Sequence, residues 1–166
     1  MDIVNVDPQD CPYYLLTRAS LAITAAFRKA FTGAGVEDVR PAYLGALMCL
    51  WRECCVDEAL GKFGGEGGMK LADLGRCAGL EPSTMTGLID RMERDGLVRR
   101  EDDRSDRRVQ RIVITEKGDA LRAAVMEAVT ATLRRSFDGI DMNELDVFKK
   151  VLRTVLSNAN RGESNE

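Results

Sequence analysis

The sequence predicts a mainly α-helical fold with a small β-wing, and the central part of the chain carries most of the evidence. A short helix over residues 71–78 is followed by a tight turn and by a second helix that begins at Pro82 and that Gly96 ends. Two strand-like stretches, 97–100 and 111–114, then flank a segment rich in arginine and aspartate. This order of helix, turn, helix and charged hairpin is typical of a winged helix-turn-helix.

The second of these helices has an apolar and a polar face. Apolar residues recur at helical spacing in Met85, Leu88, Ile89 and Met92. The opposite face and its flanks carry Ser83, Thr84, Thr86, Gly87, Asp90, Arg91 and Arg94. Short hydroxyls at a helix N-terminus can bind phosphates together with free backbone N–H groups, and such a helix fits the DNA major groove. Taken alone, the pattern also fits a solvated surface helix.

The hairpin favours the DNA interpretation. Residues 91–111 contain eight arginines, no lysine and six acidic residues, a local charge of +2 on a chain whose net charge is −3. A basic island on an acidic chain is expected of a nucleic-acid binder, and a ribbon-tip arginine can enter the minor groove. We therefore assign DNA contacts to Arg104, Arg107 and Arg108. The alternative is a surface turn whose arginines and aspartates pair with one another.

Several motifs of this region resemble the MarR family of bacterial and archaeal regulators. They are Leu71-Ala-Asp-Leu, the stretch from Pro82-Ser-Thr-Met to Gly-Leu-Val-Arg-Arg100, Asp103-Arg-Ser-Asp-Arg-Arg, and Ile114-Thr-Glu-Lys-Gly. The resemblance implies an obligate homodimer with two winged lobes that read a pseudo-palindromic duplex. It also implies release of DNA by a small ligand or by cysteine oxidation.

The resemblance also assigns roles to single residues. Asp106 is expected to brace an arginine of the wing, while Arg107 or Arg108 enters the minor groove. The family usually carries arginine at the position of Gly87. This chain therefore lacks one expected DNA contact on the helix, and we expect its operator sequence to differ from those of relatives.

Length and composition agree with a soluble regulator. The 166 residues suffice for one domain, or one core with a protruding dimerisation arm. No apolar run approaches the roughly 20 residues of a membrane span, and the acidic N-terminus lacks the features of a signal peptide. We expect a cytoplasmic protein whose five cysteines are thiols rather than structural disulfides.

Long helices are also predicted on both sides of the central segment. We assign residues 1–40 to an N-terminal dimerisation helix and 41–115 to the winged DNA-binding lobe. Residues 116–166 supply C-terminal dimerisation helices and a frayed tail. Amphipathic helices without a core of their own to cover suggest a partner surface. The alternative is that they fold back on their own chain.

The lobe includes a glycine-rich insertion at 54–68, in which five of fifteen residues are glycine. Such a stretch is too rich in glycine for a packed element. It is either a loop without a specific role or a lid beside an effector pocket.

The cysteines leave two interpretations open. The chain has no histidine and no Cys-x-x-Cys, so the usual zinc spacings are absent and no metal or cofactor is expected. We interpret Cys49 and Cys77 as small buried hydrophobes. Cys11 lies near the place where peroxide-sensing relatives carry their reactive thiol. With Cys54 and Cys55 it forms the candidate set for a redox-controlled regulator.

By resemblance, a small-molecule effector binds where the dimer helices meet the winged lobe. The residues expected there are Arg18, Tyr43, Met48 and Trp51. Aromatic and sulfur surface with one cation suits a small aromatic acid, and ordinary core packing is the alternative.

The sequence argues against an enzyme. The absence of histidine excludes Ser-His-Asp and Cys-His catalysis, and the glycines of 64–68 lack the lysine of a phosphate-binding loop. A winged helix that binds protein would not need arginines at its wing tip. We therefore predict a sequence-specific double-stranded DNA-binding transcription regulator, and specifically a repressor.

Overall fold

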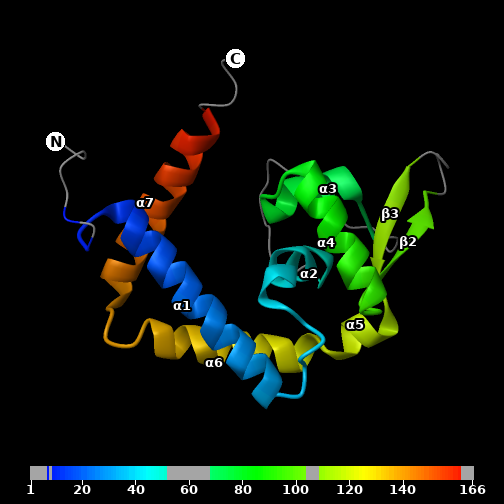
Figure 1. Cartoon of the computed structure of the whole chain (residues 1–166), viewed down its shortest axis with the longest axis horizontal. Helices are drawn as coiled ribbons and strands as arrows, with labels where there is room; N and C mark the ends of the chain where they lie inside the picture. Colours follow the sequence, from blue (N-terminus) through cyan, green and yellow to red (C-terminus); the bar gives the residue numbers. More distant parts are fainter. Residues whose placement is uncertain (1–6, 8, 52–67, 104–108, 162–166) are drawn as a thin grey trace. The chain divides into compact units, whose positions relative to one another are not determined.

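The computed structural model describes residues 7, 9–51, 68–103 and 109–161. It divides into two compact units, Met1–Thr132 and Leu133–Glu166. In chain order the elements are α1 (Pro12–Gly33), the 3₁₀ turn η1 (Pro41–Tyr43), α2 (Leu44–Trp51), β1 (Met69–Lys70), α3 (Leu71–Ala78), α4 (Pro82–Arg94), β2 (Val98–Asp102), β3 (Gln110–Ile114), α5 (Glu116–Ala120), α6 (Arg122–Ser136) and α7 (Met142–Arg161) (Figure 1). The predicted mainly α-helical fold with a small β-wing is confirmed.

A glycine turn joins α3 to α4. Gly79 adopts a φ of +65°, which ends α3, and the N–H of Leu80 donates to the carbonyl of Gly75 at 2.9 Å. Gly75 is buried, and a Cβ at this position would lie only 3.2 Å from the Leu80 carbonyl oxygen. The missing side chain therefore lets the turn close against α3. Pro82 then begins α4 at a position where its missing N–H costs nothing.

The sheet has three antiparallel strands in the order β1-β3-β2. The hairpin of β2 and β3 pairs from Val98 with Ile114 to Asp102 with Gln110, and it lies beside α4 (Figure 1). The strand β1 was not predicted, because two residues show no periodicity. It pairs with β3 after Gly68, whose φ is +72° and whose Cβ would lie 2.3 Å from the Ile112 carbonyl oxygen. Only glycine fits this approach.

One core unites the elements of the first unit. The segment 36–39, α2, α4 and β3 all contribute to it, and α6 adds Val125 and Val129. The core holds Phe31, Val36, Val39, Tyr43, Ala46, Leu47, Trp51, Leu74, Met85, Leu88, Ile89, Met92, Leu97, Val98, Ile112 and Val125. The helix α2 is buried at Ala46, Leu47, Cys49 and Trp51, and the 3₁₀ turn η1 precedes it.

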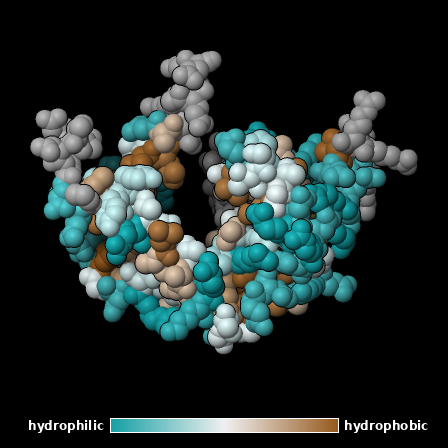
Figure 2. Space-filling model, in the orientation of Figure 1, coloured by the Kyte–Doolittle hydropathy of each residue, from teal (hydrophilic) through white to brown (hydrophobic). Residues whose placement is uncertain are grey.

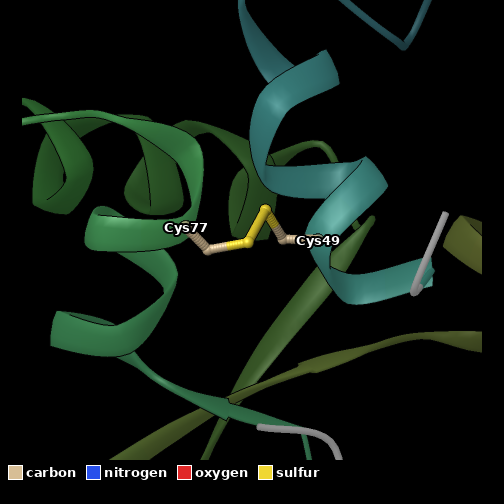
Figure 3. The surroundings of a disulfide bond; sticks show 2 residues. All are labelled: Cys49 and Cys77. Carbon is tan, nitrogen blue, oxygen red and sulfur yellow. A yellow bond between two sulfur atoms is a disulfide. The ribbon is translucent and has the colours of Figure 1, made fainter. Parts of the chain in front are cut away.

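The prediction that the cysteines are thiols is wrong for one pair. Cys49 of α2 and Cys77 of α3 are joined by a disulfide (Figure 3). Their Cα atoms are 6.5 Å apart although 28 positions separate them in the sequence. The prediction of thiols depends only on the redox state of the expected compartment. It takes no account of the distance between the two cysteines, which is set by the packing of α2 on α3. Cys11 is the free cysteine among the described residues.

The second unit contains the end of α6 and the whole of α7. Asp141 caps α7, since its carboxylate accepts the backbone N–H groups of Asn143 at 2.7 Å and Glu144 at 2.8 Å. The rings of Phe137 and Phe148 lie 6.1 Å apart and join the turn to the helix. None of the side chains at 133–159 is buried in the single chain. Across the described ranges, no helix is both long and apolar enough to cross a membrane.

Candidate nucleic-acid interface

The helix α4 exposes the polar face that the sequence predicts. Its apolar residues Met85, Leu88, Ile89 and Met92 are buried in the core. Ser83, Thr84, Thr86, Asp90, Arg91 and Arg94 are exposed, and Gly87 is half-buried. The predicted amphipathic face is therefore confirmed. The contacts that its polar residues make with DNA remain a prediction.

The N-terminal end of α4 is open to an anion. Glu81, at the N-cap, makes no side-chain capping hydrogen bond, and the first turn, which is fully described, contains no acidic residue. The first backbone N–H groups of a helix have no partner within the helix, and the helix dipole adds partial positive charge there. Ser83 and Thr84 add hydroxyl groups at the same end. The end of α4 thus suits a phosphate group.

Arg100 of β2 joins the wing to α4. Its guanidinium lies 2.6 Å from the carboxylate of Asp90 and also pairs with Glu93. Its backbone N–H donates to Glu93 at 3.1 Å. Partial burial disfavours the charge, but hydrogen bonds to Asp90 and Glu93 outweigh it and raise the pKa of Arg100. Asp90, which we placed among the DNA contacts, is therefore engaged by the protein itself.

The side chain of Arg91 covers the surface of α4 at Gly87. A Cβ at Gly87 would lie 3.6 Å from Nη1 of Arg91, so the guanidinium of Arg91 lies over the glycine. By resemblance an arginine was expected at the position of Gly87. This chain brings an arginine charge to the same part of the face from the next turn of α4.

The base of the wing is closed by an ion pair that the sequence did not predict. Asp103 is 5% exposed, and its carboxylate accepts a hydrogen bond from Arg111 at 2.8 Å. Arg111 also donates to the carbonyl of Gly68 at 2.6 Å. Asp103 thus pairs with an arginine of β3. Arg111 pairs with Glu101 across the hairpin, and Asp103 lies two residues beyond Glu101, so the two side chains are diagonal neighbours on one face of the ribbon.

The wing tip itself lies outside the described residues. This applies to the predicted DNA contacts Arg104, Arg107 and Arg108 and to the predicted support Asp106. The roles of these four residues remain predictions.

The four residues assigned to an effector pocket occupy different environments. Tyr43 is fully buried, and its hydroxyl donates to Asp95 at 2.7 Å. Trp51 is 4% exposed, and its Nε1 has no hydrogen-bond partner among the described residues. Met48 is half-buried. Arg18 is exposed on α1 and donates to the hydroxyl of Tyr14 at 3.1 Å. Tyr43 thus serves the core, whereas the described part of the chain offers the indole N–H of Trp51 no acceptor.

The redox candidates are only partly described. Cys11 is half-buried at the N-cap of α1. Cys54 and Cys55 lie outside the described residues. Within the described ranges, no three cysteine, aspartate or glutamate side chains gather in a group that could hold a metal ion.

A family model and a known regulator are similar to the central part of this chain. The model of the MarR family matches residues 64–109. The uncharacterised HTH-type transcriptional regulator YsmB of Bacillus subtilis is 36% identical over 86 residues, which cover 52% of this chain. The matched stretch spans 59% of the length of that relative.

Solved structures extend the similarity to most of the chain. CouR from Rhodococcus jostii RHA1, bound to p-coumaroyl-CoA, is 27% identical with a TM-score of 0.70 and covers 92% of this chain and 96% of its own. A MarR-family transcriptional regulator from Silicibacter pomeroyi is 28% identical with a TM-score of 0.63, over 92% of each chain. The likeness therefore includes the helices outside the winged lobe.

Tyr43 gives the first testable prediction. Burial and the hydrogen bond to Asp95 raise the pKa of Tyr43 from 10.0 to about 12. The folded state therefore keeps its proton where the unfolded chain loses it. The contribution to stability is complete below pH 10 and is lost as the pH rises toward 12, an effect of about 2–3 kcal/mol. Denaturant unfolding of Tyr43→Phe should lack this decline.

The exposed Tyr13 provides the control. Tyr13→Phe should keep the decline of the parent protein between pH 10 and 12. At pH 8, Tyr43→Phe should also be about 1–2 kcal/mol less stable than the parent, because Asp95 loses a hydrogen bond. Parallel stability curves for the parent and Tyr43→Phe above pH 10 would contradict the prediction.

Proposed function

We propose that this chain is a sequence-specific, double-stranded DNA-binding transcription regulator that acts as a repressor. The premise of this proposal is that the chain belongs to the MarR family. The main support is the exposed polar face of α4, whose N-terminal end is open to an anion. The ion pairs of Arg100 hold this face beside the wing. A helix and a ribbon fixed to each other are suited to reading two adjacent grooves.

In this proposal α4 enters the major groove. Ser83 and Thr84 bind phosphate at its N-terminal end, and Thr86, Arg91 and Arg94 face the bases or the flanking phosphates. Gly87 leaves room for the guanidinium of Arg91 on this face. Asp90 orients Arg100 rather than DNA. The tip arginines Arg104, Arg107 and Arg108 contact the minor groove, with Asp106 as their support.

The regulator is proposed to act as a homodimer on a pseudo-palindromic operator. Along α1 and α7, large apolar side chains are exposed in the single chain (Figure 2). They include Tyr13, Leu15, Leu16 and Leu21 of α1, and Met142, Val147, Phe148, Val151, Val155 and Leu156 of α7. Leu21 and Met142 are 64% and 68% exposed, so their burial requires a partner surface. This supports the assignment of residues 1–40 and 116–166 to dimerisation and of 41–115 to DNA binding.

Control by a small ligand is the favoured mechanism, and an aromatic ligand is the first class to test. CouR, at 27% identity, binds p-coumaroyl-CoA, which carries an aromatic acyl group. Trp51, whose Nε1 has no acceptor within 9–51, 68–103 and 109–161, and the half-buried Met48 offer apolar surface with one polar group. Apolar pockets orient their ligands with a few such groups. Tyr43 shapes this region from the core, and Arg18 is the proposed cation at its entrance.

The remaining assignments follow from the same premise. The family consists of transcriptional regulators, and we propose that the chain has no enzymatic activity of its own. The absence of histidine supports this, because general acid–base chemistry near neutral pH is harder without it. We also propose a cytoplasmic location, where its DNA target lies.

The wing arginines give the second prediction. Binding to a duplex from the upstream region of the chain's own gene, measured by fluorescence anisotropy, should weaken steeply with salt. Each phosphate neutralised contributes about 0.9 to the log–log slope. Arg108→Ala should cost about 1–3 kcal/mol of specific binding, because it removes the minor-groove contact.

Arg134, exposed near the end of α6, is the matched control. Arg134→Ala changes the net charge by the same amount and should leave affinity almost unchanged. Equal losses in the two variants would mean that the wing is a solvated turn. A failure to shift any upstream fragment would refute DNA binding itself.

Release of DNA gives the third prediction. When the complex is titrated with a panel of aromatic carboxylates and their thioesters, at least one of these compounds should release DNA. The variant Trp51→Phe should need about tenfold more of that compound for the same release, because the indole donor is lost. The alternative is oxidation at Cys11, Cys54 or Cys55. Peroxide-induced release that a reductant reverses, and that vanishes when these three cysteines become serine, would replace the ligand with a redox signal.

A further inference from the structure

We propose that Cys49 and Cys77 form a reversible redox site, at which a peroxide closes the disulfide, a dithiol opens it, and the closed bond strengthens DNA binding. The proposal rests on the proposed function for its effect on DNA. It differs from the redox alternative above in its residues and in its sign. Oxidation here favours the bound state instead of releasing DNA.

The two sulfur atoms meet at a close crossing of α2 and α3 (Figure 3). Gly45 and Cys49 are four positions apart, so they lie on the same face of α2. A Cβ at Gly45 would lie 3.6 Å from the Cβ of Ala78, the residue after Cys77. The Cα atoms of the cysteines are 6.5 Å apart, within the usual span of a disulfide. Small residues therefore bring the helices to bonding distance.

The position of α3 in the lobe connects the disulfide to both the wing and α4. At its start, α3 continues directly from β1, which pairs with β3 of the wing. At its end, the Gly75 backbone packs against the carbonyl of Leu80 and the side chain of Met85 in α4. A bond that fixes α3 on α2 therefore restrains both the wing and the helix proposed to enter the major groove.

The exposures of the two sulfur-bearing residues differ. Cys49 is 4% exposed, whereas Cys77 is half-buried. We take Cys77, the more exposed of the two residues, as the one that a small oxidant or a dithiol reaches first. Accessible disulfides are more readily reduced than fully enclosed ones. This asymmetry suits a reversible bond.

The chemistry requires hydrogen peroxide as oxidant. The Cys77 thiolate attacks one peroxide oxygen, the S–O bond forms as the O–O bond breaks, and water leaves after proton uptake. The Cys49 thiolate then attacks the Cys77 sulfur, the S–S bond forms, and the sulfenic oxygen leaves as a second water. Two thiols and one peroxide give one disulfide and two waters. A dithiol reverses the bond by thiol–disulfide exchange and becomes a disulfide itself.

Closing the bond should stabilise the lobe and prepare it for DNA. The bond constrains the unfolded chain between positions 28 apart. It also holds α3 in the arrangement that positions α4, which lowers the ordering cost of binding. The expected effects are a rise of about 10 °C in the melting temperature and a DNA affinity at least about fivefold higher.

The test compares full-length protein treated with hydrogen peroxide, followed by catalase, with protein reduced by dithiothreitol. Mass mapping of unreduced peptides should find Cys49 linked to Cys77 in the oxidised sample alone. Thermal unfolding and anisotropy on the upstream duplex should show the two expected shifts. Cys77→Ser should remove all three differences, and Cys49→Ala serves as a second variant that cannot form the bond.

The triple variant Cys11→Ser, Cys54→Ser, Cys55→Ser is the matched control and should respond as the parent does. Loss of the response in this triple variant would overturn the proposal, as would the absence of a Cys49–Cys77 peptide. A linked peptide with unchanged DNA affinity would also overturn it. If neither state binds DNA, the proposed function fails, while the peptide map and the melting temperature still show whether the pair is redox-active.

Discussion

The close approach of the α5 backbone to Leu97 holds the end of α4, the start of β2 and the beginning of α5 together. The carbonyl of Leu97 accepts a hydrogen bond from the N–H of Thr115 at 3.1 Å, and it shares the proton of the Thr115 hydroxyl, also at 3.1 Å, with the carbonyl of Gly96. The same hydroxyl donates to Gly96 at 2.7 Å and accepts the N–H of Gly118 at 3.0 Å. A Cβ at Gly118 would lie 2.3 Å from the Leu97 oxygen, so only glycine permits the contact. This junction fixes the angle between α4 and the wing.

Other contacts extend the junction on both sides. Lys117 donates to the carbonyl of Asp95 at 2.8 Å and pairs with Asp38 at 2.6 Å, while the Asp95 carboxylate accepts the Tyr43 hydroxyl. The last turn of α4 is therefore tied to α5, to the loop before η1 and to η1 itself. One turn earlier on α4, Arg100 adds ion pairs with Asp90 and Glu93. Because α4 is held at so many points, its polar face is already ordered before DNA binds. Binding therefore carries no added free-energy cost for ordering this helix.

The sequence predicted most of this fold because its helices are strongly periodic and their ends are marked by proline and glycine. The apolar face of α4 and the turn at Gly79 follow from such local patterns. The strand β1 has two residues and therefore no pattern. The Tyr43–Asp95 hydrogen bond joins residues 52 positions apart, and the Cys49–Cys77 bond joins residues 28 positions apart. Pairs of this kind depend on tertiary distance, which composition and spacing do not contain.

The measurement that tests the account most directly is the DNA affinity of Thr115→Val, with circular dichroism to check the fold. Valine keeps the shape of threonine but removes the hydroxyl from the junction. We predict that affinity for the upstream duplex falls at least about fivefold while the helical signal stays, because α4 and the wing lose their fixed angle. Thr32→Val, which removes an exposed hydroxyl from α1, should bind as the parent does. Unchanged affinity in Thr115→Val would contradict the claim that the junction makes helix and wing one DNA-binding unit.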